Sequence, residues 1–161
     1  DYDCTLESYA QSWADRCIYP GHSPPSHRNG TGENMMMDIA TMSPTDALVE
    51  ATRLWWDEIR TCGLVIGSTT TYDDYNTSCV RGHFTQCTWA RTTLIGCGVR
   101  FCENGTFYGV NKPGLVVVCN YKEAGNVIGQ PITQIGNPCQ TDSECTTFPG
   151  STCDASMGLC Q

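Results

Sequence analysis

The sequence has few basic side chains and few charged side chains of any kind. Nine Lys and Arg stand against seventeen Asp and Glu, which gives a formal net charge of −8. Such a surface repels phosphate backbones and anionic lipids, which argues against nucleic-acid binding and electrostatic membrane docking. No apolar run approaches the about 20 residues of a transmembrane helix, so the chain is not expected to be transmembrane.

The chain also lacks the short motifs of several common enzyme classes. It contains no Gly-x-Ser-x-Gly elbow, no His-Glu-x-x-His helix and no phosphate-binding loop. Histidine is scarce, since His22, His27 and His83 are the full set. The even number of cysteines lets every thiol pair, which argues against a cysteine nucleophile.

Cysteine, by contrast, is abundant. Twelve cysteines in 161 residues are typical of an oxidising compartment, and we expect all twelve to be oxidised. Three N-x-S/T sequons, at Asn29, Asn76 and Asn104, predict N-glycosylation. Together these features predict a secreted, extracellular glycoprotein. The sequence shows no signal peptide, so we expect a mature or processed chain.

The spacing of apolar residues predicts helices first and strands later. Residues 6–17 follow the pattern of an amphipathic helix. A second helix is expected to begin after Ser43 as N-cap and to end at Gly63, and residues 67–81 read as a long loop. Alternating patterns predict strands over 84–90, 94–102, 106–110 and 115–121. This order favours an α+β fold or a layered sandwich over a doubly wound parallel sheet.

Residues 139–161 form a cysteine-rich tail with few large apolar side chains. Because the tail cannot fold by burial alone, we expect two internal disulfides to hold it. Four cysteines allow three pairings, and the sequence does not choose among them. Zinc is the alternative reading, but the close Cys-x-x-Cys pairs of zinc sites are absent. The cysteines are Cys139, Cys145, Cys153 and Cys160.

Two histidines and two glutamates have the chemistry of a functional site. His22 lies in a Pro- and Gly-rich loop and His83 at the start of a predicted strand, and Glu33 and Glu58 are the candidate carboxylates. These groups bind Zn²⁺ or a similar divalent ion, or act as acid and base on a bound water. Their spacing does not show that they meet, and a structural, hydrogen-bonded His83 is the alternative. His27 reads as solvated loop.

Several short segments resemble the CAP superfamily, which includes cysteine-rich secretory proteins, antigen 5 venom proteins and plant pathogenesis-related proteins. Residues 82–92, GHFTQCTWART, look like its first signature, and residues 119–127, CNYKEAGNV, look like its second. Three further matches follow in the family's order: His22-Ser23, Gly32-Glu33-Asn34-Met35 and Trp55-Trp56-Asp57-Glu58. The sequence is most similar to the activation-associated secreted proteins of parasitic nematodes. The resemblance implies an α+β, three-layer α-β-α sandwich over residues 1–138, followed by a hinge-like tail over 139–161.

By motif position, the resemblance places His22, His83, Glu33 and Glu58 in one central cavity, whose histidines bind a divalent metal such as zinc. It implies a secreted, non-catalytic protein of the host–parasite interface that binds a host protein or a small ligand. One alternative is a zinc hydrolase in which a glutamate serves as base. The other is sterol or lipid binding through the tyrosine-bearing loop 72–80. The sequence does not identify a host partner.

The chain departs from the family pattern at a few positions. Cys87 stands where the first signature usually has an apolar residue, and Glu123 differs from the second. The family's first helix is expected ahead of Asp1 and is missing from this sequence. The resemblance also implies a disulfide between Cys102 and Cys119.

Overall fold

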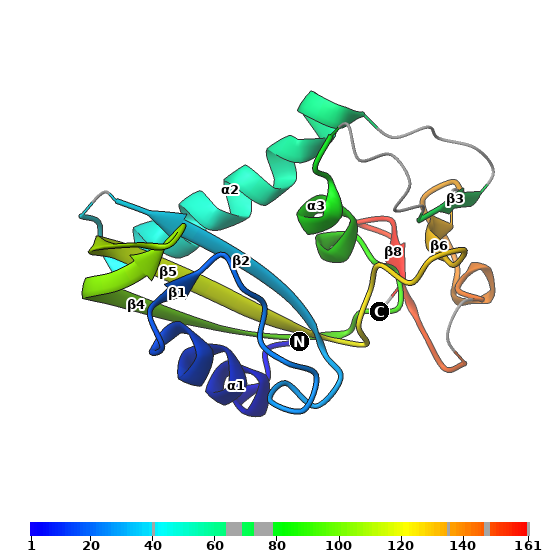
Figure 1. Cartoon of the computed structure of the whole chain (residues 1–161). Coiled ribbons are helices and arrows are strands. Elements are labelled where there is room, and N and C mark those ends of the chain that lie inside the picture. The colour runs from blue at the N-terminus through cyan, green and yellow to red at the C-terminus, as the bar shows by residue number, and fades with distance from the viewer. Residues whose placement is uncertain (40, 64–68, 73–78, 135, 147–148, 161) are drawn as a thin grey trace.

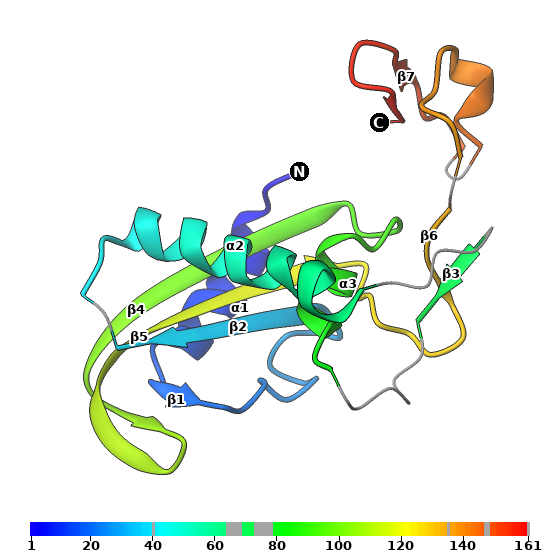
Figure 2. The ribbon, with the colours of Figure 1, turned by 90° about the horizontal axis from the view of Figure 1, so that it is seen from above.

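The computed structural model describes residues 1–39, 41–63, 69–72, 79–134, 136–146 and 149–160, and its centre is a sheet between two helices (Figures 1 and 2). Helix α1 (Cys4–Ala14) covers one face, and helix α2 (Pro44–Cys62) covers the other. The order across the sheet is β1 (Ile18–Tyr19), β4 (Leu94–Phe107), β5 (Val110–Lys122) and β2 (Gly32–Asp38). Strand β1 is parallel to β4, and the other pairs are antiparallel. The predicted three-layer α-β-α sandwich is confirmed.

Local signals place both helices. The Asp3 carboxylate accepts hydrogen bonds from the backbone N–H groups of Thr5 and Leu6, and so caps α1. The Ser43 hydroxyl accepts from the Asp46 N–H at the start of α2. Gly63, with φ of 65°, ends α2 in a backbone conformation that residues other than glycine rarely adopt. In the part of the chain that the structure describes, no helix is long and apolar enough to cross a membrane.

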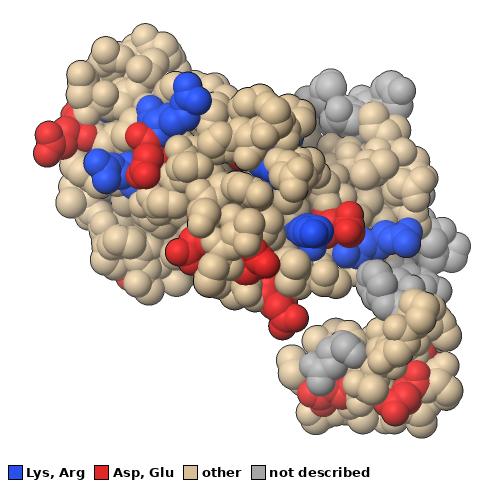
Figure 3. Space-filling model, turned by 90° about the horizontal axis from the view of Figure 1, so that it is seen from below, with Lys and Arg blue, Asp and Glu red and all other residues tan. Residues whose placement is uncertain are grey.

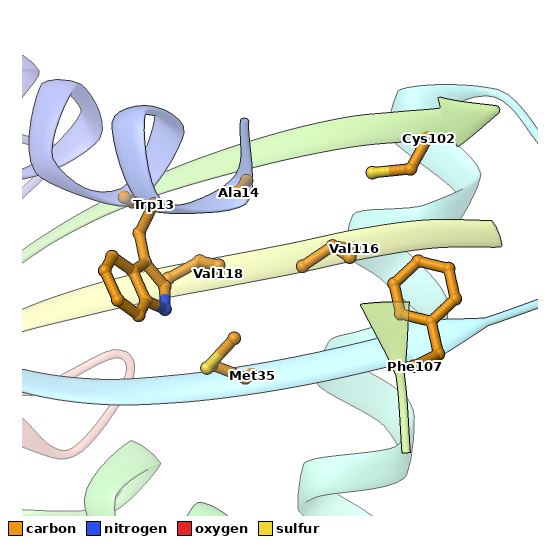
Figure 4. Packing of buried hydrophobic residues seen from close by; sticks show 8 residues of the cluster. Trp13, Ala14, Met35, Cys102, Phe107, Val116 and Val118 are labelled. Carbon is orange, nitrogen blue, oxygen red and sulfur yellow. The ribbon is translucent and has the colours of Figure 1, made fainter. Parts of the chain in front are cut away.

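The core divides into two layers because side chains alternate along the strands. On β5, Val116 and Val118 face α1 (Figure 4). Val117, between them, faces α2. The cluster under α1 consists of Ala10, Trp13, Ala14, Met35, Cys102, Phe107, Val116 and Val118. The cluster under α2 consists of Met36, Ala47, Ala51, Trp55, Leu115, Val117, Cys119 and Tyr121.

Two glycines let α1 lie directly on β4. A Cβ atom at Gly98 would lie 2.4 Å from Cα of Gln11, and one at Gly96 would lie 2.1 Å from the Glu7 nitrogen. These distances are far below van der Waals contact, so only glycine fits at either position without moving the helix. The layer spacing on this side is therefore set by the absence of two side chains.

The predicted strand 84–90 is wrong, because residues Gly82–Cys87 form the short helix α3. A side chain that is distant in sequence stabilises the first turn of α3: the Glu58 carboxylate accepts a hydrogen bond from the Phe84 N–H at 2.9 Å. The predicted strands 94–102 and 106–110 are parts of β4 and β5, and β4 is continuous through an irregularity between Cys102 and Gly105. The expected loop 67–81 contains β3 (Thr69–Thr71), which pairs with β6 (Pro131–Gln134).

The predicted Cys102–Cys119 disulfide is also wrong. Cys102 faces α1 and Cys119 faces α2, so the sheet separates their side chains. Cys119 instead pairs with Cys97, its register partner on β4, and Cys102 pairs with Cys17 just after α1. A third bond joins Cys62 to Cys79. The expectation that all twelve cysteines are oxidised fails as well, because Cys4 and Cys87 are free thiols.

The tail cysteines pair among themselves, as expected. The bonds are Cys139–Cys153 and Cys145–Cys160. They hold a 3₁₀ turn, η1 (Asp142–Glu144), and a hairpin of β7 (Cys153–Asp154) and β8 (Leu159–Cys160). Figure 3 shows the tail as a separate lobe, on which the coloured side chains are acidic.

Candidate functional site

His22 and Glu33 form the first of two histidine–carboxylate pairs. Glu33 lies on β2, and its Oε1 is 2.9 Å from His22 Nδ1. The same carboxylate accepts the Ser23 N–H at 2.8 Å and the Ser23 hydroxyl at 2.6 Å. The Glu33 side chain is only 1% exposed, whereas that of His22 is 58% exposed. The imidazole therefore projects outward from a buried anionic support.

His83 and Glu58 form the second pair, between α3 and α2. His83 Nδ1 lies 2.6 Å from Glu58 Oε1, and Glu58 Oε2 accepts the Phe84 N–H. The ring of Trp55, one turn before Glu58 on α2, stacks on the His83 ring with centroids 6.0 Å apart. The turn that begins α3 and the second half of α2 thus fix this imidazole on two sides.

Both pairs share one arrangement of hydrogen bonds. In each, a glutamate accepts from the imidazole Nδ1 and from the backbone N–H of the residue after the histidine. A carboxylate on Nδ1 favours the tautomer in which the proton is on Nδ1. The lone pair of Nε2 is then available to a metal ion, and the carboxylate fixes the orientation of the ring.

The electrostatics of Glu33 agree with this geometry. Burial raises the pKa of the Glu33 carboxyl, but hydrogen bonds from His22 and Ser23 lower it by more, so its pKa lies below the ordinary value. Arg28 adds a positive charge, because its Nη1 lies 3.6 Å from Glu33 Oε1. Glu33 therefore remains ionised at neutral pH despite its burial.

A cleft of about 320 Å³ opens beside the first pair. It is lined by His22, Pro25, Arg28, Gly30, Thr31, Gly32, Glu33, Gln86, Ala124, Gly125 and Asn126. Asn126 links the lining of the cleft to α3, because its amide donates to the carbonyl of Gly82, the residue before His83. The two segments that resemble family signatures thus meet at this cleft.

The four predicted residues come together as two pairs, and a metal centre shared by both histidines stays a prediction. Within the described ranges, the sole group of at least three His, Cys, Asp or Glu ligand atoms within 4.8 Å of one another consists of Cys139, Cys145 and Cys160. All three sulfurs are in disulfides.

Other predicted positions stay untested. The sequon residues Asn29 and Asn104 are exposed, whereas Asn76 lies outside the described residues. Most of the loop 72–80, proposed for sterol binding, also lies outside them. Tyr72 is described, and its ring packs edge-on against Trp89 with centroids 6.4 Å apart.

Sequence reasoning missed Arg28, and its prediction for His27, the residue before it, was incomplete. Arg28 donates from Nη1 to the Ser23 carbonyl, and it lines the cleft. His27 is not simply solvated, because its Nε2 lies 2.9 Å from the Ser12 hydroxyl on α1 and its ring contacts Trp13. The signal that was available is their position between His22 and Glu33, in a loop that has to fold back onto β2.

Comparison with protein families gives a match over most of the chain. The family model "CAP: Cysteine-rich secretory protein family" matches residues 1–121. "Ancylostoma secreted protein" of Ancylostoma caninum is 34% identical over 161 residues, which are 99% of this chain and 34% of that protein. "Peptidase inhibitor 16" of Mus musculus is 35% identical over 157 residues, which are 97% of this chain and 28% of that protein. The chain thus spans about a third of the length of these relatives.

Solved structures agree with the fold. The structure described as "Crystal structure of NaASP2 with Zn2+" superposes with a TM-score of 0.80 at 31% identity, covering 100% of this chain and 75% of that one. "Structure of BmVAL-1" superposes with a TM-score of 0.78 at 34% identity, covering 99% of this chain and 74% of that one.

Proposed function

The chain belongs to the cysteine-rich secretory protein (CAP) family, and we propose that it is a secreted, non-catalytic recognition protein of the host–parasite interface that binds a divalent cation through His22 and His83. The similarity to a secreted protein of Ancylostoma supports the setting. The five disulfides support an oxidising, extracellular compartment. A host protein or a small ligand is the proposed partner.

The shared arrangement of the two His–Glu pairs carries the metal proposal. Each glutamate holds its histidine by Nδ1 and leaves Nε2 for a ligand bond. Zinc accepts imidazole nitrogen readily, so the donor set fits it. The NaASP2 structure described with Zn²⁺ supports the same choice of ion. Other divalent cations that bind imidazole fit the same donors.

The hydrogen bonds of the carboxylates favour binding over hydrolysis. A hydrolase needs a carboxylate that can take a proton from a metal-bound water. Both oxygens of Glu33 and of Glu58 already accept hydrogen bonds from the chain. Two histidines are also one protein ligand short of the usual catalytic zinc site. We therefore expect no turnover of a peptide library after zinc is added.

Calorimetric titration with zinc at pH 7.5 and pH 5 tests the metal proposal. We expect His22→Ala and His83→Ala each to weaken binding by at least about tenfold, whereas His27→Ala leaves it intact, because Nε2 of His27 is held by Ser12. Affinity should fall at pH 5, since free imidazole is protonated below about pH 6.5 and then cannot bind metal. Equal affinity at the two pH values, or full binding in His83→Ala, would place the metal elsewhere.

A further inference from the structure

Most polar side chains of the cleft are already hydrogen-bonded within the chain. Gln86 accepts from the Gly125 N–H and donates to Thr92, and Asn126 donates to Gly82 and accepts from Thr85. One oxygen and one N–H group of each amide are therefore already engaged within the chain. Among the described residues that line the cleft, His22 and Arg28 keep ring or guanidinium nitrogens without a partner in the chain.

Arg28 uses only one corner of its guanidinium. Its Nη1 donates to the Ser23 carbonyl and faces Glu33. Among the described residues, no partner is found for Nε or Nη2, and the side chain remains 21% exposed. The edge formed by Nε and Nη2 presents two parallel N–H groups, the arrangement that binds a carboxylate by both oxygens.

The Arg28 guanidinium and the His22 imidazole are neighbours, because both lie against the same oxygen, Glu33 Oε1. Among the described residues that line the cleft, Glu33 is the only carboxylate; its side chain is 1% exposed, and both of its oxygens accept hydrogen bonds within the chain. The Glu33 oxygens contact His22, Ser23 and Arg28, and their burial keeps them from direct contact with a ligand. A ligand that enters the cleft therefore meets the positively charged Nε–Nη2 edge of Arg28, although the net charge of the chain is −8.

We propose that the cleft selects ligands that carry a carboxylate group, which binds to the free Nε–Nη2 edge of Arg28. This ligand class rests on the proposed function of the chain as a recognition protein that binds a host protein or a small ligand. A cation held by His22 adds positive charge beside the fork and strengthens the attraction. A planar monoanion fits one fork, whereas a phosphate dianion presents more oxygens and more charge than a single arginine satisfies. The carboxylate belongs to a small organic acid or to the C-terminus of a peptide.

The test is a titration of the ¹⁵N-labelled chain with N-acetylglycine and with its uncharged amide, followed by NMR shifts of the Gly30–Gly32 and Ala124–Asn126 amides. We expect the acid to bind at least about tenfold more tightly than the amide. Arg28→Lys keeps the charge but removes the fork, and should lower the affinity for the acid about tenfold. Arg100→Lys is the matched control, because Arg100 is 58% exposed on β4 and lies away from the cleft lining.

The same titrations with EDTA and with zinc separate this inference from the metal proposal. Selective binding of the acid in EDTA, lost in Arg28→Lys, supports the carboxylate site even if zinc has no effect. Zinc binding without preference for the acid supports the metal and overturns the carboxylate site. Equal NMR shifts for the acid and the amide in the wild-type protein also overturn the carboxylate site. This comparison needs no variant, so it stands even if Arg28→Lys does not fold. Peptides with a free and with an amidated C-terminus, titrated beside acetate, then identify the source of the carboxylate.

Discussion

Protonation or replacement of Glu33 should destabilise the site in a way that depends on pH. The carboxylate accepts bonds from His22 Nδ1, the Ser23 N–H and the Ser23 hydroxyl at 2.9, 2.8 and 2.6 Å. Glu33→Gln keeps the shape but removes the charge that strengthens these bonds, at about 1 kcal/mol each. Relief of the buried charge offsets part of that loss, which leaves a net destabilisation of about 2 kcal/mol at neutral pH.

The sign follows from the lowered pKa of Glu33. A group whose pKa is lower in the folded state stabilises the fold above its unfolded pKa, about 4.3 for glutamate. That stability is lost as pH falls through the folded pKa, because protonated Glu33 no longer offers a charge to His22 and Ser23. The difference in unfolding free energy between wild type and Glu33→Gln should therefore be full at pH 6 and should shrink at pH 3.

Urea unfolding followed by tryptophan fluorescence measures this difference, because Trp13, Trp55 and Trp89 are buried in the main domain, the part of the chain before the tail (residues 1–138). Glu144→Gln is the control: backbone hydrogen bonds lower the pKa of Glu144 too, but this residue is exposed and lies in the tail. It should leave main-domain unfolding unchanged at both pH values. A gap between wild type and Glu33→Gln that is as large at pH 3 as at pH 6 would refute the assignment of the stabilisation to the Glu33 charge.

Two further changes test the packing and the tail. Gly98→Ala should lower the free energy of unfolding in urea by about 3 kcal/mol, because the new methyl group meets the backbone of Gln11. Gly136→Ala is the control and should have almost no effect, because a methyl group there meets open space. Equal effects of the two changes would contradict the close approach of α1 to β4. Replacing Cys139 and Cys153 by serine should make residues 139–161 sensitive to protease and leave the main-domain midpoint unchanged, since the tail has its own disulfides. A lowered main-domain midpoint would show that the tail supports the sandwich.

The sequence predicted the two long helices well because their signals are local. Ser43 and Gly63 mark the ends of α2 within the helix's own sequence. Helix α3 was misread because what stabilises its first turn is far away in the chain. Glu58 accepts from its backbone, and the Asn126 side chain bonds Gly82 and Thr85. Contacts of that range leave no pattern in a window of a few residues.

The disulfide error has a geometric cause. Cys97 and Cys102 are an odd number of residues apart on β4, so their side chains point to opposite faces of the sheet. The odd spacing decides which cysteine can pair with Cys119. It can be used only when β4 is known to be continuous and its partner strand and register are known. In the candidate site, too, only part was predictable from sequence. Motif context pointed to the His–Glu residues, whereas the position of Arg28 depends on how one loop folds over β2. No local sequence pattern predicts how that loop folds.

The bond between Cys17 and Cys102 closes a covalent ring that contains 84 intervening residues, since the two positions are 85 apart in sequence. His22, Glu33, Glu58 and His83 all belong to this ring. A protease that cuts the chain once between residues 18 and 101 opens the ring but frees no fragment, because both pieces remain joined through the disulfide. The residues proposed to bind metal would thus stay on one covalent molecule after a single cut, and only reduction would separate the pieces.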